Sequence, residues 1–341
     1  MTTYLWAHKY QPRSLRELTF NPELTDTLQQ LAAEEELPHL IFHGPSGAGK
    51  KTRVAALLRE IYGPKVNKSR LQSVRIQTAP SKFIDTRVTT SSCHSQLTPS
   101  FAGNKDRFVI QEYLKTMAQS GNINARSRHR YNVVVLDEAH LMTREAQAAL
   151  RRTMEVYSKS IRIILIADTL SNIIAPIRSR ALLLRVPSPP VEEISQAVNK
   201  ILEWEGTTIP PSTLNDMVLS SNRNARIAIS RVQTMVLRAP APPCDPDWVA
   251  AIDSIAKMII SSQIVLNVLR VRIELYILLS HCIPGATILK ELMFRLLQLS
   301  PKRAHLKIIK AGKDADHRLR LGLKDIYHLE AFVVKAMDAL R

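Results

Sequence analysis

A glycine-rich loop followed by two lysines is the feature of this sequence best suited to chemistry. The stretch HGPSGAGKKT, His43 to Thr52, lies between an apolar run and a helix-forming segment. Glycines let the backbone curl so that its N–H groups converge on a phosphate, and the helix start adds positive potential. We expect Lys50 to reach the β- and γ-phosphates of a nucleotide. The residues of the predicted cradle are Gly44, Pro45, Ser46, Gly47, Ala48, Gly49, Lys50, Lys51 and Thr52.

Two acids form the second chemical feature. Asp137 and Glu138 end the apolar run of YNVVVLDEAH, which is the context of a Walker B pair. Asp137 would hold a magnesium ion through water, and Glu138 would polarise the attacking water. Such a pair could by itself be a helix cap, but its position downstream of a phosphate loop favours the catalytic interpretation.

Lys51 departs from the usual pattern at the point where the metal needs a ligand. Mg²⁺ takes an oxygen ligand, normally the Ser or Thr hydroxyl directly after the loop lysine. An ammonium group has three donors and no acceptor, so Lys51 cannot coordinate a cation. Thr52 cannot replace it, because one residue along a helix turns the side chain by about 100°. We therefore expect ATP or ADP to bind with weakened Mg²⁺, placed near Asp137 if present, and with slow or absent hydrolysis.

Apolar runs that alternate with helical segments indicate an α/β fold. The predicted strands are Leu40–Phe42, Val133–Leu136, the run IRIILIADT and the run RALLLRVP. A helix is expected from Lys50 to Tyr62, ended by Gly63-Pro64. Fully apolar strands between helices predict a parallel sheet that is covered on both faces.

Proline-rich stretches divide the chain. PSPP, from Pro187 to Pro190, and RAPAPPCDPDW, near Pro240 to Pro246, have the composition of linkers, and strand signals stop after the first. We therefore predict an α/β nucleotide-binding domain over 1–187, a small helical domain over 188–240 and a helical domain over 241–341. The last segment carries apolar residues at helical spacing.

Charge indicates the kind of partner. The 341 residues include 47 Lys and Arg against 30 Asp and Glu, a formal net charge of +17. Such an excess favours a polyanionic partner such as nucleic acid. Aromatic residues make up only 5% of the chain, so phosphate contacts are expected rather than base stacking. Three scattered cysteines favour a reducing compartment, and neither a secretory signal nor a membrane span is expected.

Several motifs together give the sequence a family resemblance over nearly its whole length. They are LWAHKYQP, PHLIFHGPSGAGKKTR, DRFVIQEYLKTMAQS, ALRRTMEVY, PIRSRALLLRVPSP and LGLKDIYHLEAFV. With these motifs the chain resembles the small subunits of replication factor C, the eukaryotic clamp loader of the AAA+ class, in the branch numbered three in vertebrates and five in fungi. The Lys-Lys-Thr end of the loop is typical of that branch.

The resemblance implies a fold and a set of partners. It implies an AAA+ core, a helical lid and an all-α collar that joins the subunits. It also implies a nuclear hetero-pentamer that loads a sliding clamp onto primer–template DNA in replication and repair.

The resemblance also assigns roles to residues outside the loop. Trp6, Lys9, Tyr10 and Pro12 would belong to an N-terminal segment near the adenine, although Gln11 stands where the family usually has Arg. Arg226 would be a lid arginine that senses the γ-phosphate.

Two further positions concern hydrolysis. Arg180, in Ser179-Arg180-Ala181, would be an arginine finger that acts on the next subunit's nucleotide, although Ala stands where the family has Cys. Asp168 stands where the family's sensor strand usually has Asn. A carboxylate there adds negative charge near the γ-phosphate unless it is protonated or paired.

DNA contacts are implied at two helix starts, where backbone amides and basic side chains can bind phosphate. The expected residues are Asn104, Lys105, Arg107, Thr143 and Arg144. Simple helix capping is an equally good interpretation for each of them taken singly.

One alternative function is a self-sufficient P-loop ATPase motor, since DEAH at 137–140 resembles a helicase motif. Such an enzyme needs two α/β domains, and only one is expected here. A checkpoint or bacterial-type loader is a further alternative, which depends on the large subunit that joins.

Overall fold

The computed structural model describes residues 4–34, 36–79, 82–119, 131–238, 246–322 and 324–340. Contacts divide the chain into two compact units, Met1–Pro242 and Pro243–Arg341, each with a hydrophobic core. None of the helices within these ranges is long and apolar enough to cross a membrane.

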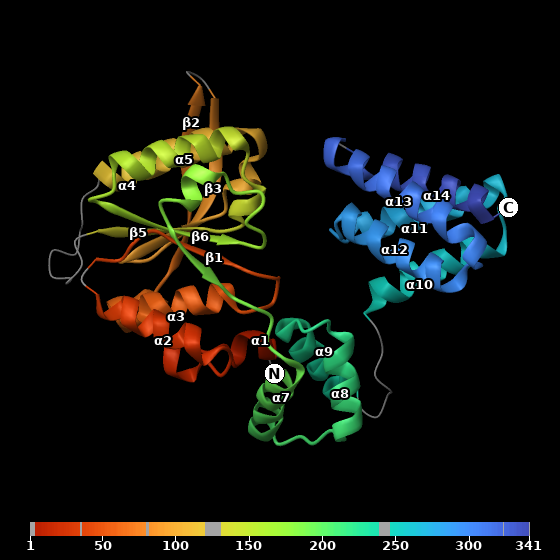
Figure 1. The fold of residues 1–341 in the computed structure, drawn as a ribbon, viewed down its shortest axis with the longest axis horizontal. Helices are drawn as coiled ribbons and strands as arrows, with labels where there is room; N and C mark the ends of the chain where they lie inside the picture. Colours follow the sequence, from red (N-terminus) through yellow and green to blue (C-terminus); the bar gives the residue numbers. More distant parts are fainter. Residues whose placement is uncertain are drawn as a thin grey trace. The chain divides into compact units, whose positions relative to one another are not determined.

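A mixed sheet of seven strands, counted over the described residues, forms the centre of the first unit (Figure 1). The strand order is β2-β3-β4-β5-β6-β1-β7. Strands β4 to β7 and β1 run parallel, whereas β2 pairs antiparallel with β3, and β3 with β4. The bounds are β1 Leu40–His43, β2 Arg70–Ala79, β3 Lys82–Thr90, β4 His94–Leu97, β5 Asn132–Leu136, β6 Ile161–Ala167 and β7 Leu182–Arg185.

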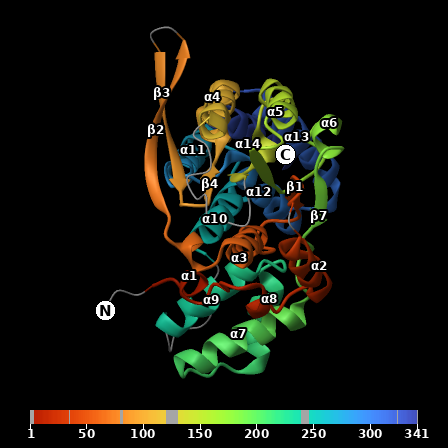
Figure 2. The ribbon, with the colours of Figure 1, turned by 90° about the vertical axis from the view of Figure 1, so that its left-hand side faces the viewer.

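The predicted α/β fold is confirmed, and the sheet differs from the prediction at one edge. The four predicted strands correspond to β1, β5, β6 and β7. Strands β2, β3 and β4 were missed, and they add an antiparallel hairpin, which Figure 2 shows as a long ribbon. In β2 the exposed Leu71 and the buried Ile76 stand among polar residues, so the hairpin lacks the continuous apolar run of a covered strand.

Helices cover both faces of the sheet (Figure 1). On one face α4 (Asp106–Gln119) and α5 (Arg144–Val156) pack against β5 and β6. On the other face α2 (Pro22–Ala33) and α3 (Lys50–Tyr62) share a core with β1. The short helices are α1 Trp6–Lys9, η1 Leu15–Glu17, η2 Pro64–Asn67, η3 Pro99–Lys105, η4 Ala139–Leu141 and α6 Ala175–Arg178.

Three helices follow the sheet and still belong to the first unit. They are α7 (Val191–Glu205), α8 (Pro211–Ser220) and α9 (Ala225–Arg238). Their core includes Trp6, which α1 contributes from the other end of the sequence. This helical part matches the segment expected to be a lid, and its boundary at 187/188 stays a prediction.

The second unit is helical throughout its described residues. It consists of α10 (Asp247–Ser261), α11 (Val265–Ser280), α12 (Gly285–Leu299), α13 (Lys302–Leu321) and α14 (Asp325–Leu340). Their apolar faces meet in one core around Leu275, Leu292 and Phe332. A second α/β domain, which the motor alternative needs, is therefore not found in the described part of this unit.

Candidate nucleotide site

The glycine-rich loop joins the end of β1 to the start of α3 and keeps the backbone close to its neighbours. Gly49 caps α3 with a φ of 89°, a left-handed conformation that favours glycine. At Gly44 a Cβ atom would lie 1.9 Å from the carbonyl oxygen of Val186. The loop geometry thus requires glycine at both positions, as a phosphate cradle does.

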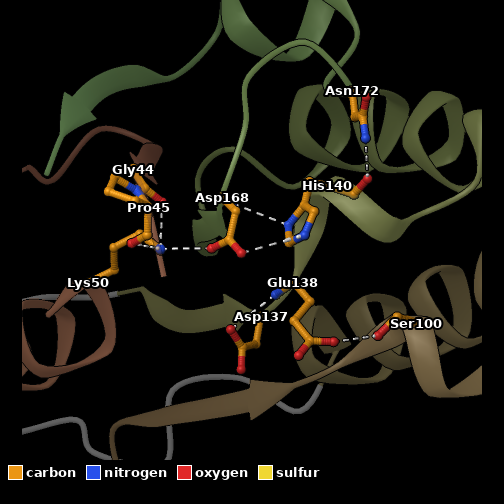
Figure 3. Close-up of polar contacts among 9 residues, drawn as sticks. All are labelled: Gly44, Pro45, Lys50, Ser100, Asp137, Glu138, His140, Asp168 and Asn172. Atoms are coloured by element: carbon orange, nitrogen blue, oxygen red, sulfur yellow. Dashed lines mark hydrogen bonds and ion pairs between the residues drawn. The ribbon is translucent and has the colours of Figure 1, made fainter. Parts of the chain in front are cut away.

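Lys50 is buried, and its ammonium group is fully engaged within the chain (Figure 3). Its Nζ donates to the carbonyl oxygens of Gly44, at 2.7 Å, and Pro45, at 2.9 Å. It also donates to Oδ1 of Asp168 at 2.8 Å, which forms an ion pair. Because an ammonium has three N–H donors, a phosphate must replace at least one of these acceptors.

Asp168 is held by the chain on both its backbone and its side chain. Its backbone N–H donates to Nδ1 of His140 at 3.2 Å, and its Oδ2 lies 3.9 Å from His140 Nε2. The backbone carbonyl of His140 accepts a hydrogen bond from Asn172 (Figure 3). Asp168 is thus paired, which is one of the two conditions under which its charge is compatible with a nearby phosphate.

The second lysine binds the first Walker B acid. Lys51 Nζ forms an ion pair with Oδ2 of Asp137, whose side chain is almost fully buried. The other oxygen of Asp137 accepts a hydrogen bond from the backbone N–H of Glu138 at 3.0 Å. Glu138 in turn accepts a hydrogen bond from the hydroxyl of Ser100 at 3.0 Å. Both acids therefore have partners within the chain.

The weakened magnesium binding expected at the cradle stays a prediction, and the contacts of Thr52 and Lys51 bear on it. Thr52 Oγ1 accepts a hydrogen bond from Gln11 Nε2 at 3.2 Å, whereas Lys51 Nζ pairs with Asp137. Over the described residues no group of three or more His, Cys, Asp or Glu side chains is placed to hold a metal ion. Lys51 adds its positive charge beside Asp137, where the metal would be expected.

A cavity of about 250 Å³ adjoins the loop, and it could hold an adenine and a ribose. The N-terminal segment, the loop and α9 each contribute to its wall. Predicted site residues that line it are Trp6, Tyr10, Pro12, Gly47, Ala48, Gly49, Lys51, Thr52 and Arg226. The apolar side chains and the loop amides fit a nucleotide, so the cradle and the cavity together can hold one.

Lys9 lies outside this cavity. Its Nζ pairs with Oε1 of Glu205 at 2.7 Å, and the same oxygen accepts the Tyr10 hydroxyl hydrogen bond at 2.7 Å. The hydrogen bond from Lys9 lowers the pKa of the Glu205 carboxyl. Tyr10 also stacks on Trp204 with ring centroids 5.2 Å apart. Lys9 therefore anchors the N-terminal segment to α7 rather than contributing to the cavity wall.

Arg180 lies just after α6 and is held by an acid of α5. Its Nη2 pairs with Oε1 of Glu155 at 2.6 Å, and its Nη1 donates to the Pro176 carbonyl at 2.9 Å. About 40% of its side chain is exposed. These two contacts hold the guanidinium at the surface, and neither of them involves a residue of the cradle.

A single buried carboxylate joins the two helix starts expected to bind DNA phosphate. Asp106 Oδ1 accepts from the Arg107 N–H at 2.8 Å and from the Thr143 hydroxyl at 2.9 Å. Its Oδ2 accepts from the Thr143 N–H at 2.8 Å. Lys105 and Arg144 are exposed, whereas the side chain of Asn104 lies outside the described residues. The contacts bring both helix starts together, and their role in DNA binding stays a prediction.

Comparison with known proteins settles the family. A family model described as "Replication factor C subunit 3, C-terminal domain" matches residues 248–341, and one described as "DNA polymerase III, delta subunit" matches residues 20–190. Replication factor C subunit 5 of Schizosaccharomyces pombe is 43% identical over 98% of this chain and 96% of that protein. This chain belongs to the replication factor C small-subunit family. Subunit 3 of Homo sapiens is 41% identical, with 98% and 95% covered, and subunit 5 of Saccharomyces cerevisiae is 40% identical, with 98% and 99% covered.

Five residues of this replication factor C site were missed in the sequence. His140 and Ser100 hold Asp168 and Glu138, Arg53 lines the cavity, Asp106 joins two helix starts and Glu155 holds Arg180. Arg53 is fully buried and donates to the Phe20 carbonyl of the cavity wall, and burial lowers its pKa. Arg53 directly follows the loop, His140 is the last residue of DEAH, Asp106 lies between the predicted Lys105 and Arg107, and Glu155 lies within the motif ALRRTMEVY, so each had a usable signal in the sequence. Ser100 had none of these signals, and its contact with Glu138 joins residues 38 positions apart.

Proposed function

We propose that this chain is a clamp-loader subunit that holds ATP or ADP mainly as a structural ligand and donates Arg180 to a neighbouring subunit's site. The observation that carries the proposal is the pair of lysines in the cradle, each already neutralised by an acid. Membership of the replication factor C family supports the clamp-loader role.

The cradle can exchange its internal contacts for nucleotide. Lys50 would replace its two backbone carbonyls with phosphate oxygens, while Asp168 retains the third donor. The apolar walls formed by Trp6, Pro12 and Ile229 would exclude water from the base. Bound nucleotide would thereby join the N-terminal segment, the loop and α9.

Hydrolysis at this site should be slow. Mg²⁺ supplies charge neutralisation during phosphoryl transfer when it is bound. Lys51 supplies positive charge at Asp137 instead, but it cannot orient the reacting oxygens as an octahedral ion does. The Ser100 hydroxyl already donates to one oxygen of Glu138, which leaves chiefly the other oxygen to polarise a water.

Arg180 is suited to act in trans. The Glu155 pair at 2.6 Å fixes the guanidinium at the surface, and a partner's phosphates would compete with that carboxylate. The assembly would be a nuclear hetero-pentamer that loads a sliding clamp onto primer–template DNA in replication and repair. Lys105, Arg107, Thr143 and Arg144 would then contact the DNA backbone.

The experiment compares three variants in the reconstituted complex. We expect Arg180→Ala to lower DNA-stimulated ATPase activity more than Lys50→Ala does, because the chemistry occurs at the neighbour's site. Arg178→Ala is the matched control, since Arg178 is an exposed arginine two residues away. A larger loss with Lys50→Ala would overturn the donor role, and a stoichiometric Mg²⁺ that copurifies with this subunit's nucleotide would overturn the metal-poor site.

A further inference from the structure

Helix α13 of the second unit begins with cations that have no acidic partner among the described residues. Between residues 300 and 313 the sequence SPKRAHLKIIKAGK contains no acid. Five side chains here lie on exposed residues, and within the described residues none makes an ion pair. They are Lys302, Arg303, Lys307, Lys310 and Lys313. We name them the α13 cation row.

The second half of the same helix is neutralised within the chain. Asp316 pairs with Arg320 at 2.9 Å, and Asp314 pairs with Lys335 of α14 at 3.8 Å. The excess charge is therefore confined to the first three turns of α13, and it is a local feature rather than the composition of the whole helix.

The α13 cation row does not serve the stability of its helix. The positive end of the helix dipole lies at the N-terminus, so Lys302 and Arg303 are unfavourable in the first turn. The neighbouring helices α10 and α14 follow the favourable rule, because Asp247 and Asp325 lie in their first turns. Exposed, unpaired cations at an unfavourable position indicate an anionic ligand.

Three members of the row form a line along the helix. Arg303, Lys307 and Lys310 are spaced by four and three residues, so they share one face of the helix and rise by about 6 and 4.5 Å. An adjoining face of the helix, with Ala304 and Ile308, is buried in the core of the unit. Figure 1 shows α13 as one long uninterrupted helix beside α12 and α14.

A hollow of about 570 Å³ between α12 and α13 extends the row. Lys290 of α12 and Lys313 of α13 both line it, above a floor that includes Met293. Gly312 lets the two helices approach, because a Cβ there would lie 2.6 Å from the Met293 sulfur. Glu291, Asp316 and Arg320 also line the hollow, and Asp316 pairs with Arg320 at 2.9 Å.

We propose that the α13 cation row binds the phosphate backbone of a nucleic acid strand, independently of base sequence. Helix α13 has no Phe, Tyr or Trp, so it lacks the side chains that stack best on bases. Lysine and arginine at successive turns match a linear polyanion, and the protein carries a net charge of +17. An acidic protein segment is the competing ligand. It would need apolar anchors, and among the described residues between 302 and 313 only Leu306 and Ile309 are exposed large apolar side chains.

The test uses the full chain and a fluorescein-labelled oligo-dT strand, with anisotropy measured over a salt series. In the variant Arg303→Gln/Lys307→Gln/Lys310→Gln we expect binding to weaken by about tenfold or more. The slope of log K against log salt should also fall by about 2, since each lost phosphate contact contributes roughly 0.7 on a single strand.

The matched control removes three cations that already have acidic partners in the same unit, Lys257, Arg272 and Lys335. Their exchange to Gln changes net charge equally and should leave the slope nearly unchanged. Equal slopes for both triple variants would overturn the proposal. So would a row-dependent binding of poly-glutamate that oligo-dT does not displace, because it would assign the surface to an acidic protein. The variant Lys105→Gln/Arg144→Gln tests the helix starts of the first unit separately.

Discussion

The cations at the two surfaces proposed to bind phosphate occur in two arrangements in this molecule. In the cradle, Lys50 and Lys51 each contact one acid, Asp168 and Asp137. On α13, five cations lie in solvent without an acid. In the cradle a ligand must therefore displace an existing partner, which favours a defined phosphate geometry. On α13 nothing needs to be displaced, which favours any polyanion and makes binding sensitive to salt.

We expect the largest effect on nucleotide binding when the buried cation of the cradle, Lys50, is removed. We expect Lys50→Met to weaken nucleotide binding by roughly 100-fold, about 3 kcal/mol, because it removes charged hydrogen bonds and leaves Asp168 unpaired. Titration calorimetry with ADP and ATP measures the loss. Lys200→Met, at an exposed lysine of α7, is the control and should bind as the unmodified chain does. Equal affinities for the two variants would contradict a role for Lys50 in phosphate binding.

Protonation of His39 shows how much an unpaired buried cation lowers the free energy of unfolding of the first unit. Burial, with a smaller contribution from Arg162, lowers the pKa of His39 from 6.5 to about 4. Its Nδ1 accepts the Ile163 N–H at 3.0 Å, which requires the neutral ring. Because the unfolded chain binds this proton more readily, stability is full above about pH 6.5 and is lost as the pH falls toward 4. Between pH 7 and 5 we expect a loss of about 2 kcal/mol.

Urea unfolding at both pH values measures this loss. The background Trp248→Phe leaves Trp6 and Trp204, so fluorescence reports the first unit. His39→Asn, which keeps an acceptor and cannot titrate, should flatten the pH dependence in part, since burial also lowers the pKa of His43 and His94. An unchanged pH dependence in that variant would remove His39 from the explanation.

Restoring a hydroxyl at position 51 should give the cradle a metal ligand in place of its internal pair. In Lys51→Thr we expect Mg²⁺ to strengthen nucleotide binding by about tenfold, or 1.4 kcal/mol, because Asp137 is freed and an oxygen ligand is supplied. Calorimetry with Mg²⁺ and with EDTA gives the difference. Lys51→Ala frees Asp137 without supplying the oxygen, so a similar gain in both variants would show that the hydroxyl is not needed.

The sequence predicted the cradle better than it predicted the cradle's partners. The loop, the Walker B acids and the helix Lys50–Tyr62 follow from local spacing, so they could be found without a structure. The Lys50–Asp168 pair joins residues 118 positions apart, and the sequence showed only that Asp168 would be unfavourable unless paired. The hairpin of β2 and β3 was missed because its alternating residues give no continuous apolar run.

We expect the smallest effect on nucleotide affinity when the negative charge of Asp168 is removed. A phosphate oxygen that shares the Lys50 ammonium with Asp168 lies within roughly 5 Å of that carboxylate, given two contacts near 3 Å on one nitrogen. At an effective dielectric near 20 and with this side chain 43% exposed, screening reduces the repulsion to about 1 kcal/mol. In Asp168→Asn we therefore expect metal-free ATP to bind about fivefold more tightly, and ADP, with one charge fewer, to gain less.

Competition with a fluorescent nucleotide in EDTA measures both gains. The control is Asp253→Asn, which removes one paired acid of the second unit. If this variant gained as much nucleotide affinity as Asp168→Asn, the net charge of the chain would explain the gain, and the position of Asp168 in the cradle would not.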